Sequence, residues 1–132
     1  MYDLLIEKFV AMKDKSDELK QRTQQFALRI IKLCKSLPAG KDADVIGKQL
    51  LRSGTSVGAN YRAASRARSQ ADFISKITIC EEEADESGYW MELIIASGLM
   101  KKELVNDLSK EAGELTAIFT ASDKTARANK KN

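Results

Sequence analysis

Apolar side chains recur every three or four residues along most of the chain, and no segment alternates apolar and polar residues with a period of two. The first spacing lines one face of an α-helix, whereas a half-buried strand requires the second. Four apolar stripes have this helical spacing, and they cover residues 26–37, 46–64, 73–95 and 104–119. The chain is therefore predicted to be all-α, with four amphipathic helices.

Helix-breaking residues separate the stripes. Pro38 and Gly40 are expected to end the first helix, and Gly98 is a suitable C-terminal stop for the third. The connections are short, which favours antiparallel neighbours and hence an antiparallel up-down four-helix bundle. We assign residues 17–125 to the bundle, residues 1–16 to a short N-terminal amphipathic arm or helix, and residues 126–132 to a disordered basic tail.

The composition removes several classes of function. The 132 residues include no histidine, which excludes a histidine base, a histidine-bound zinc and the Glu-x-x-His di-iron site of helical bundles. The two cysteines are far apart and are expected to be reduced core thiols. No apolar run approaches the ~20 residues that span a bilayer, and the N-terminus does not read as a secretory signal. We expect a cytoplasmic protein with no membrane contact, cofactor, bound metal, small-molecule substrate or enzymatic activity.

The segment RSGTSVGANYRAASRARS, residues 52–69, combines glycines and hydroxyls with four arginines. A phosphate-binding loop of the Walker type needs a preceding strand and Gly-Lys-Ser/Thr after a four-residue gap, and both are missing. On a helical wheel, the apolar stripe from Ile46 to Ala64 keeps its phase across Gly54 and Gly58, which a loop would reset. Residues 44–68 are therefore predicted to form one unbroken helix.

Small residues form a second face of this helix. Each glycine inside a helix costs about 1 kcal/mol relative to alanine, so a compensating contact is expected. A face without side chains lets another helix backbone approach closely, either inside the bundle or at a subunit interface, and both alternatives stay open. The members of this close-packing or oligomer face are Gly47, Leu51, Gly54, Gly58 and Ser65.

Basic residues form the third face. The net charge is only +3, yet residues 20–68 contain eleven bases and two acids, whereas residues 81–92 contain six acids and no base. Because arginine binds phosphates and carboxylates alike, the basic face is either solvated, paired with the acidic segment, or bound to a nucleic-acid backbone. The candidate nucleic-acid-binding residues are Lys48, Arg52, Arg62, Arg66 and Arg68.

Asn60 is a polar residue near the apolar stripe of the same helix. We predict that it hydrogen-bonds to Glu81 or Glu82 on the third helix and sets the register of the two helices, because polar core residues more often fix register than catalyse. The carboxylates of EEEADES are interpreted as an exposed face that pairs with arginines, since the second and fourth helices offer few acids for a two-metal site.

The stretch from Gln49 to Ile94 resembles a known family. Its run RSGTSVGANYRAA, followed by ADFI and by EEADES with YW and EL, is similar to the signature of the four-helix-bundle proteins encoded in intervening sequences of bacterial 23S ribosomal RNA genes, and the flanks QFALRIIKL and ELTAIF fit. The resemblance implies an up-down bundle that assembles into a homopentamer. It also implies distant kinship with the accessory variability protein of diversity-generating retroelements, a basic pentamer that binds a reverse transcriptase and nucleic acid. It implies no enzymatic activity.

Two functional hypotheses follow. The first is a non-enzymatic oligomeric scaffold of this family type, associated through its basic face with RNA or with another nucleic-acid-processing protein. The alternative is a protein–protein interaction module that binds no nucleic acid. The pairing of Arg52, Arg62 and Arg66 discriminates between them, because free guanidinium groups favour the first hypothesis and buried ion pairs favour the second.

Overall fold

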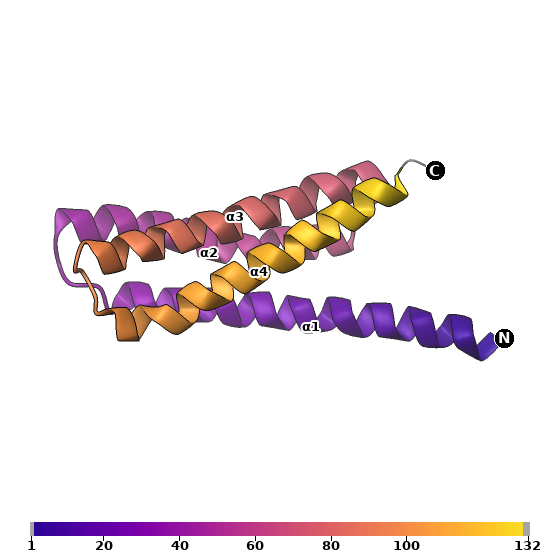
Figure 1. The fold of residues 1–132 in the computed structure, drawn as a ribbon, viewed down its shortest axis with the longest axis horizontal. Coiled ribbons are helices and arrows are strands. Elements are labelled where there is room, and N and C mark those ends of the chain that lie inside the picture. The colour runs from indigo at the N-terminus through magenta and orange to yellow at the C-terminus, as the bar shows by residue number, and fades with distance from the viewer. Residues whose placement is uncertain (1, 131–132) are drawn as a thin grey trace.

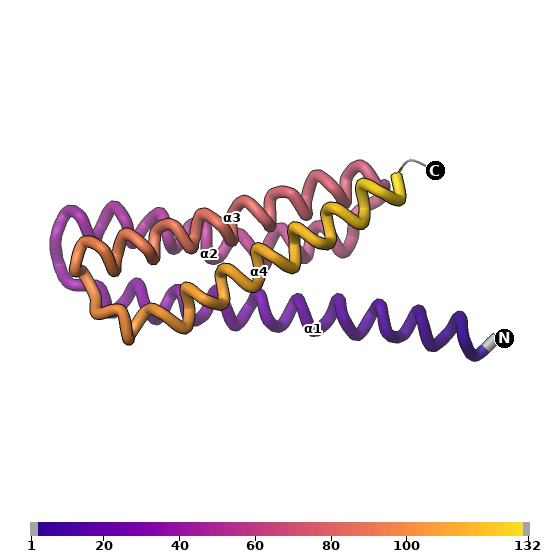
Figure 2. Tube along the Cα trace, in the orientation of Figure 1, coloured from indigo at the N-terminus to yellow at the C-terminus, as the bar shows by residue number. Residues whose placement is uncertain are grey.

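The computed structural model describes residues 2–130, which form four helices joined by short turns (Figure 1). α1 spans Tyr2–Lys35, α2 spans Lys41–Ser65, α3 spans Gln70–Ala96 and α4 spans Lys102–Asn129. Consecutive helices run in opposite directions, with α2 packed on α1 and α3, and α4 packed on α3. The predicted antiparallel up-down four-helix bundle is confirmed. α1 and α4 meet over a shorter length and diverge toward the end of the bundle that holds the N-terminus (Figure 2).

The turn between α3 and α4 follows the predicted glycine signal. Gly98 has a left-handed φ of 78°, and the amide of Leu99 donates to the carbonyl of Ile94 at 3.1 Å. This is the glycine-dependent ending that satisfies the last carbonyls of a helix. At the other end of α3, the hydroxyl of Ser69 accepts from the amide of Asp72 at 3.0 Å and caps the helix.

The core is a continuous cluster of apolar side chains from all four helices. Its largest fully buried members come from the predicted stripes, and they include Phe26, Ile30, Leu50, Ile77, Met91, Ile94, Leu115 and Phe119. Complete burial of one such side chain stabilises the fold by about 1.5–3 kcal/mol. The bundle is therefore stabilised mainly by the apolar residues whose three- and four-residue spacing predicted the helices.

α2 is unbroken across its glycines, as predicted, and these glycines face α1 of the same chain. A Cβ on Gly54 would lie 2.7 Å from Cγ1 of Ile30, and a Cβ on Gly58 would lie 3.2 Å from Oγ1 of Thr23. A Cβ on Gly47 would lie 3.1 Å from Leu37. Internal packing of α1 on α2 therefore accounts for the three glycines. The other two members of the predicted face, Leu51 and Ser65, are exposed.

No break separates the predicted arm, residues 1–16, from the bundle, because α1 runs continuously from Tyr2 to Lys35. The apolar spacing of the bundle carries on toward the N-terminus and gives the helix no reason to stop. Residues 2–14, here called the arm, project past the other helices (Figure 2). On this arm the side chains of Leu5, Phe9 and Met12 are between 70% and 73% exposed.

The predicted disordered tail is also corrected, because α4 extends through Asn129. Ala126 is buried, and its carbonyl accepts a hydrogen bond from Nε2 of Gln70 at 3.0 Å. Contacts with α3 thus keep this segment helical despite its basic composition. Residues 131 and 132 of the predicted tail lie outside the described residues.

Candidate nucleic-acid interface

Arg52, one of the five predicted nucleic-acid contacts, is held by two carboxylates of α3. Its Nη1 lies 3.0 Å from Oε2 of Glu83, and its Nη2 donates to Glu86. Nε1 of Trp90 donates to the same Glu86 oxygen at 3.0 Å. The Glu83 side chain is only 14% exposed, against 51% for Arg52. This guanidinium is therefore engaged by two of the six acids of residues 81–92 and is not free to bind a phosphate.

The other four predicted bases are exposed, and none of their charged groups lies within 4.0 Å of a carboxylate of residues 2–130. Arg62 and Arg66 are one helical turn apart near the end of α2, and Arg68 follows in the turn to α3. No acidic residue occurs between Asp44 and Asp72. We call Arg62, Arg66 and Arg68 the arginine end. Lys48 is separate, because it precedes Arg62 by about 21 Å along the helix.

The end of α4 carries further bases, with Lys124 in the predicted bundle and Arg127 in the predicted tail. The contact between Gln70 and Ala126 brings this helix end to the start of α3, at the same end of the molecule as the arginine end (Figure 1). Arg127 is tied down, with its Nε 3.0 Å from Oδ1 of Asp123. Lys124 is exposed, with no carboxylate of the described chain within 4.0 Å. The helical end of α4 therefore extends the positive surface.

The predicted hydrogen bond between Asn60 and Glu81 or Glu82 is wrong. Nδ2 of Asn60 donates to the carbonyl of Ser56 in its own helix at 2.9 Å. Glu81 accepts from the hydroxyl of Thr120 on α4, and Glu82 is exposed. A helical wheel places Glu81 beside the apolar stripe but does not say which neighbouring helix lies on that side. The structure puts α4 there, whereas Glu83 and Glu86 face α2.

The polar contact that joins α2 and α3 in the core is a pair of serines. The hydroxyls of Ser53 and Ser87 are hydrogen-bonded at 2.9 Å, and both side chains are completely buried. Ser87 also lies 2.8 Å from the carbonyl of Glu83. Ser53 lies in the predicted apolar stripe of α2. A polar residue among apolar ones was the one sequence signal that could have predicted this buried hydrogen bond.

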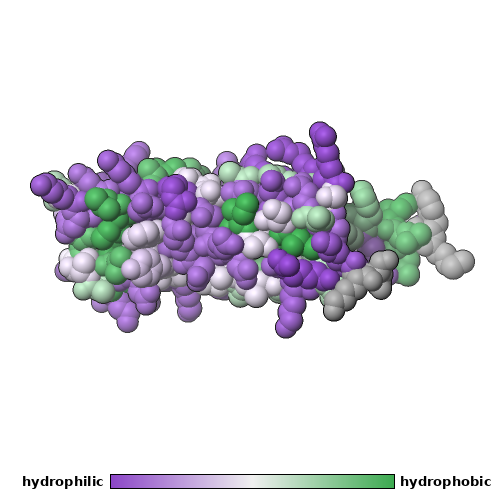
Figure 3. All heavy atoms as spheres, turned by 90° about the horizontal axis from the view of Figure 1, so that it is seen from above, coloured by the Kyte–Doolittle hydropathy of each residue, from purple (hydrophilic) through white to green (hydrophobic). Residues whose placement is uncertain are grey.

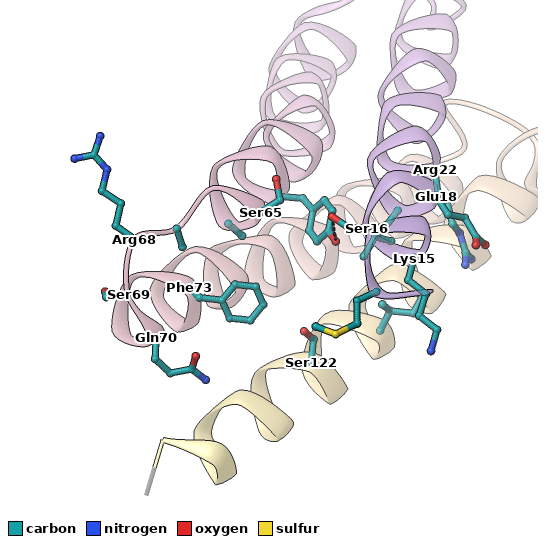
Figure 4. Close-up of a pocket in the computed structure, with 16 residues that line it drawn as sticks. Lys15, Ser16, Glu18, Arg22, Ser65, Arg68, Ser69, Gln70, Phe73 and Ser122 are labelled. Atoms are coloured by element: carbon teal, nitrogen blue, oxygen red, sulfur yellow. Dashed lines mark hydrogen bonds between the residues drawn. The ribbon is translucent and has the colours of Figure 1, made fainter. Parts of the chain in front are cut away.

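A groove of about 830 Å³ opens at the base of the arm, where α1 and α4 diverge (Figure 4). Its apolar lining includes Leu19 of α1, Tyr61 of α2, Phe73 of α3 and Ile118 of α4. In Figure 4 the ring of Phe73 points into this space, whereas the Arg68 side chain points away from it. The groove therefore presents an apolar interior beside the arginine end.

Neither cysteine has the character of a reactive thiol. Cys80 is completely buried, and burial raises its pKa to about 12. Burial also raises the pKa of the half-buried Cys34. Because the thiolate is the reactive form, both groups suit the core better than catalysis. Within residues 2–130, no three His, Cys, Asp or Glu side chains gather as a metal-ligand set, and no helix there is long and apolar enough to cross a membrane.

The fold and its surface define a class of small all-helical bundles with a concentrated basic end. The chain belongs to the 23S rRNA-intervening sequence protein family, whose model matches residues 15–121. It is similar to a crystallised protein of unknown function from the S23 ribosomal protein family of Bacteroides thetaiotaomicron VPI-5482. The two share 39% identity with a TM-score of 0.74, over 80% of this chain and 97% of that chain. No curated protein matches the chain. The family resemblance predicted from the sequence is confirmed.

Proposed function

We propose that this protein is a non-enzymatic, cytoplasmic, oligomeric scaffold that binds RNA through the arginine end. The proposal is carried by the three exposed guanidinium groups of Arg62, Arg66 and Arg68, which have no carboxylate neighbour among the described residues. Guanidinium groups bind phosphates through paired hydrogen bonds. RNA is the polyanion proposed here, and the family description refers to 23S rRNA only as the place of the intervening sequence.

Oligomerisation strengthens this proposal. Three arginines make few phosphate contacts, but a ring of copies such as a homopentamer multiplies them without any new contact within one chain. Tyr61, the aromatic residue nearest to Arg62 in sequence, is buried. Recognition of the RNA backbone is therefore favoured over the reading of bases, which needs exposed stacking side chains.

A second candidate is a protein-interaction module that binds no nucleic acid. The pairing of Arg52 with Glu83 and Glu86 favours it, because this pairing removes one guanidinium from the predicted basic face. In this case the arginine end contacts an acidic surface on another protein, such as a nucleic-acid-processing enzyme.

A salt titration of RNA binding tests the two candidates. Binding to a structured RNA is measured from low to physiological salt for the wild type and for the triple variant R62Q/R66Q/R68Q. The matched control K101Q/K102Q/K110Q removes the same charge from exposed lysines in α4 and at its N-cap, which lie away from the arginine end. We expect a steep salt dependence that the arginine variant reduces by about 0.7–0.9 in logarithmic slope per lost phosphate contact, and that the control retains. A flat wild-type response would contradict RNA binding and favour the second candidate.

A further inference from the structure

The outer face of α3 carries an exposed acidic stripe, whose members are Glu82, Asp85, Tyr89 and Glu92. No base of residues 2–130 lies within 4.0 Å of its three carboxylates. Tyr89 is 52% exposed, and its ring lies edge-on to that of Trp90 with 5.1 Å between the ring centroids. Trp90 is itself held by its hydrogen bond to Glu86. The acidic stripe therefore presents a fixed aromatic side chain among acids that lack a basic partner in the described chain.

The outer face of α2 carries a second exposed stripe, here called the basic stripe, whose members are Lys48, Leu51 and Thr55. Leu51 is 38% exposed, and the amine of Lys48 has no carboxylate of the described residues within 4.0 Å. Over the bundle, apolar surface forms separate patches among hydrophilic side chains (Figure 3). A contact on such a surface needs complementary charges as well as apolar side chains.

The two stripes share the spacing of a helix–helix seam. Successive members of the basic stripe, read forward from Lys48, are three and then four residues apart. Successive members of the acidic stripe, read backward from Glu92, have the same two separations. Alternating steps of three and four residues line the seam along which two helices pack side by side. The stripes therefore match as the two sides of an antiparallel helix pair.

The register of α2 and α3 places the stripes at the same height. Ser53 and Ser87 are hydrogen-bonded at 2.9 Å, so they stand level in the antiparallel pair. Both helices rise equally per residue, so a step back along α2 matches a step forward along α3. The pairs of residues that stand level are Lys48 with Glu92, Leu51 with Tyr89, and Thr55 with Asp85.

Within one chain the level residues do not meet, because each stripe lies on the exposed side of its own helix. In a closed ring whose axis runs along the bundle, all copies have the same height and direction. The α2 helix of one copy then lies antiparallel to α3 of the next copy, and the level residues come face to face. An amine meets a carboxylate, an aliphatic side chain meets an aromatic ring, and a hydroxyl meets a carboxylate.

The charges disfavour other occupants of these stripes. Two acidic stripes packed on each other about a two-fold axis would bring carboxylates against carboxylates, which repel. RNA is repelled by the acidic stripe for the same reason. A second copy that offers its basic stripe supplies the charge that the acidic stripe lacks.

We infer that the chains join head to tail, with the basic stripe of one copy packed on the acidic stripe of the next. The inference rests on the oligomer of the proposed function and names the surfaces that build it. A contact between two different surfaces closes into a ring without requiring an even number of chains. Glu82, the last acid of the stripe, is level with residue 58, so the arginine end lies beyond the contact. The ring therefore gathers the arginine ends of all copies at one rim.

Light scattering on full-length variants tests the contact. L51D places a carboxylate opposite Tyr89, among the acids of the next copy. The matched control L28D makes the same change at a leucine of α1 that is 51% exposed. We expect the mass of L51D to fall to that of one chain, the mass of L28D to equal the wild type, and helical circular dichroism to be unchanged in both.

The other outcomes separate this inference from the proposed function. An unaltered mass for L51D would overturn the contact and leave RNA binding untouched. A monomeric wild type would overturn both the contact and the proposed oligomer. R62Q/R66Q/R68Q should keep the wild-type mass, because the arginine end lies outside the contact, and a fall to one chain would overturn the assigned surfaces.

Charge reversal tests the pairing of Lys48 with Glu92. K48E and E92K should each lower the mass at equal protein concentration, because each brings like charges together across every contact. The double variant K48E/E92K should recover the wild-type mass, since the pair is regenerated with its signs exchanged. A double variant that stays dissociated would contradict the pairing.

Cysteines test the head-to-tail direction. L51C and Y89C, co-expressed on chains of different tag length, should form a disulfide-linked pair of unlike chains under mild oxidation. Each variant expressed alone should stay unlinked, because residue 51 meets residue 89 and not its own equivalent. The wild type, with Cys34 and Cys80, controls for the native thiols. Linking of either variant alone, or no linking of the co-expressed chains, would refute the head-to-tail contact.

Discussion

The guanidinium of Arg22 on α1 is joined to the carboxylate of Glu111 on α4 by two hydrogen bonds of 2.8 and 2.7 Å. This bidentate pair links α1 and α4, which have the least extensive contact of the neighbouring helices in the bundle. The hydrogen bonds from Arg22 lower the pKa of Glu111 below its ordinary value of 4.5. The pair therefore couples the packing of α1 on α4 to pH.

The free energy of unfolding is expected to depend on pH because of this ion pair. A carboxylate whose pKa is lower in the folded state stabilises the protein above its unfolded pKa, and this contribution is lost as the pH falls through the folded value. The wild type should exceed Glu111→Gln in free energy of unfolding at neutral pH, and the difference should shrink as the pH falls below about 4.5. Urea unfolding of both proteins at several pH values measures this. A difference independent of pH would contradict the assigned role of the carboxylate.

Gly54 and Gly113 are expected to respond oppositely to alanine. Both lie inside helices, where alanine is intrinsically better by about 1 kcal/mol. A Cβ on Gly54 would lie within 3.1 Å of three atoms of Ile30, whereas a Cβ on Gly113 would have no neighbour within 4 Å. Gly54→Ala should destabilise the fold by about 1–3 kcal/mol through overpacking, and Gly113→Ala should stabilise it by up to about 1 kcal/mol. Thermal unfolding compares the two variants. Stabilisation by both would show that Ile30 shifts at little cost to make room for the added methyl group.

The buried serine pair should show non-additive energetics. Ser53→Ala and Ser87→Ala are each expected to reduce the free energy of unfolding by about 1 kcal/mol, because each leaves the opposite hydroxyl with fewer partners. The double variant should be less destabilised than the sum, since no unpaired hydroxyl is left behind. Denaturant unfolding of all three variants completes the cycle. Additive effects would mean that the backbone carbonyls satisfy each serine separately.

Arg66 and Arg52 form a matched pair for RNA binding. Both are arginines of the same segment, but only Arg52 is held by carboxylates. Arg66→Gln should lower the logarithmic salt slope by about 0.7–0.9, and Arg52→Gln should leave it unchanged while destabilising the fold by up to about 1 kcal/mol. Titrations of RNA binding and urea unfolding provide the two readouts. Equal loss of binding in both variants would place Arg52 in the interface.

Cys80 is expected to be modified only when the protein unfolds. Its thiol is completely buried and has a pKa of about 12, so almost no thiolate exists at pH 8. Alkylation by iodoacetamide, followed by peptide mass spectrometry, should label Cys34 first and Cys80 only as denaturant is added. Rapid labelling of Cys80 in buffer would reveal local opening between α2 and α3.

The sequence was sufficient for the helices and for the continuity of α2, because both follow from the local spacing of apolar residues. The continuity of α1 through the predicted arm was not anticipated, although nothing in the sequence interrupts the helix near Ser16. The tail was misjudged because its helix depends on the contact between Gln70 and Ala126, which lie far apart in sequence.

The candidate site was predictable only in part. The basic residues and the acidic segment were evident, but a wheel gives the phase of a helix and not the identity of its neighbours. Glu83 and Glu86 therefore pair with Arg52 on α2, whereas Glu81 accepts a hydrogen bond from Thr120 on α4. The pairing takes Arg52 and leaves Arg62, Arg66 and Arg68 without a carboxylate neighbour among the described residues. Which arginine is paired depends on how α3 is rotated between α2 and α4.

The continuity of α1 also has a practical consequence. Its 34 residues make a rod about 51 Å long, and the half that contains Phe26 and Ile30 is clamped in the bundle. A spectroscopic reporter attached near Asp3 would therefore move rigidly with the bundle. Distances measured between such reporters would give the separation of the N-terminal helix ends of neighbouring copies.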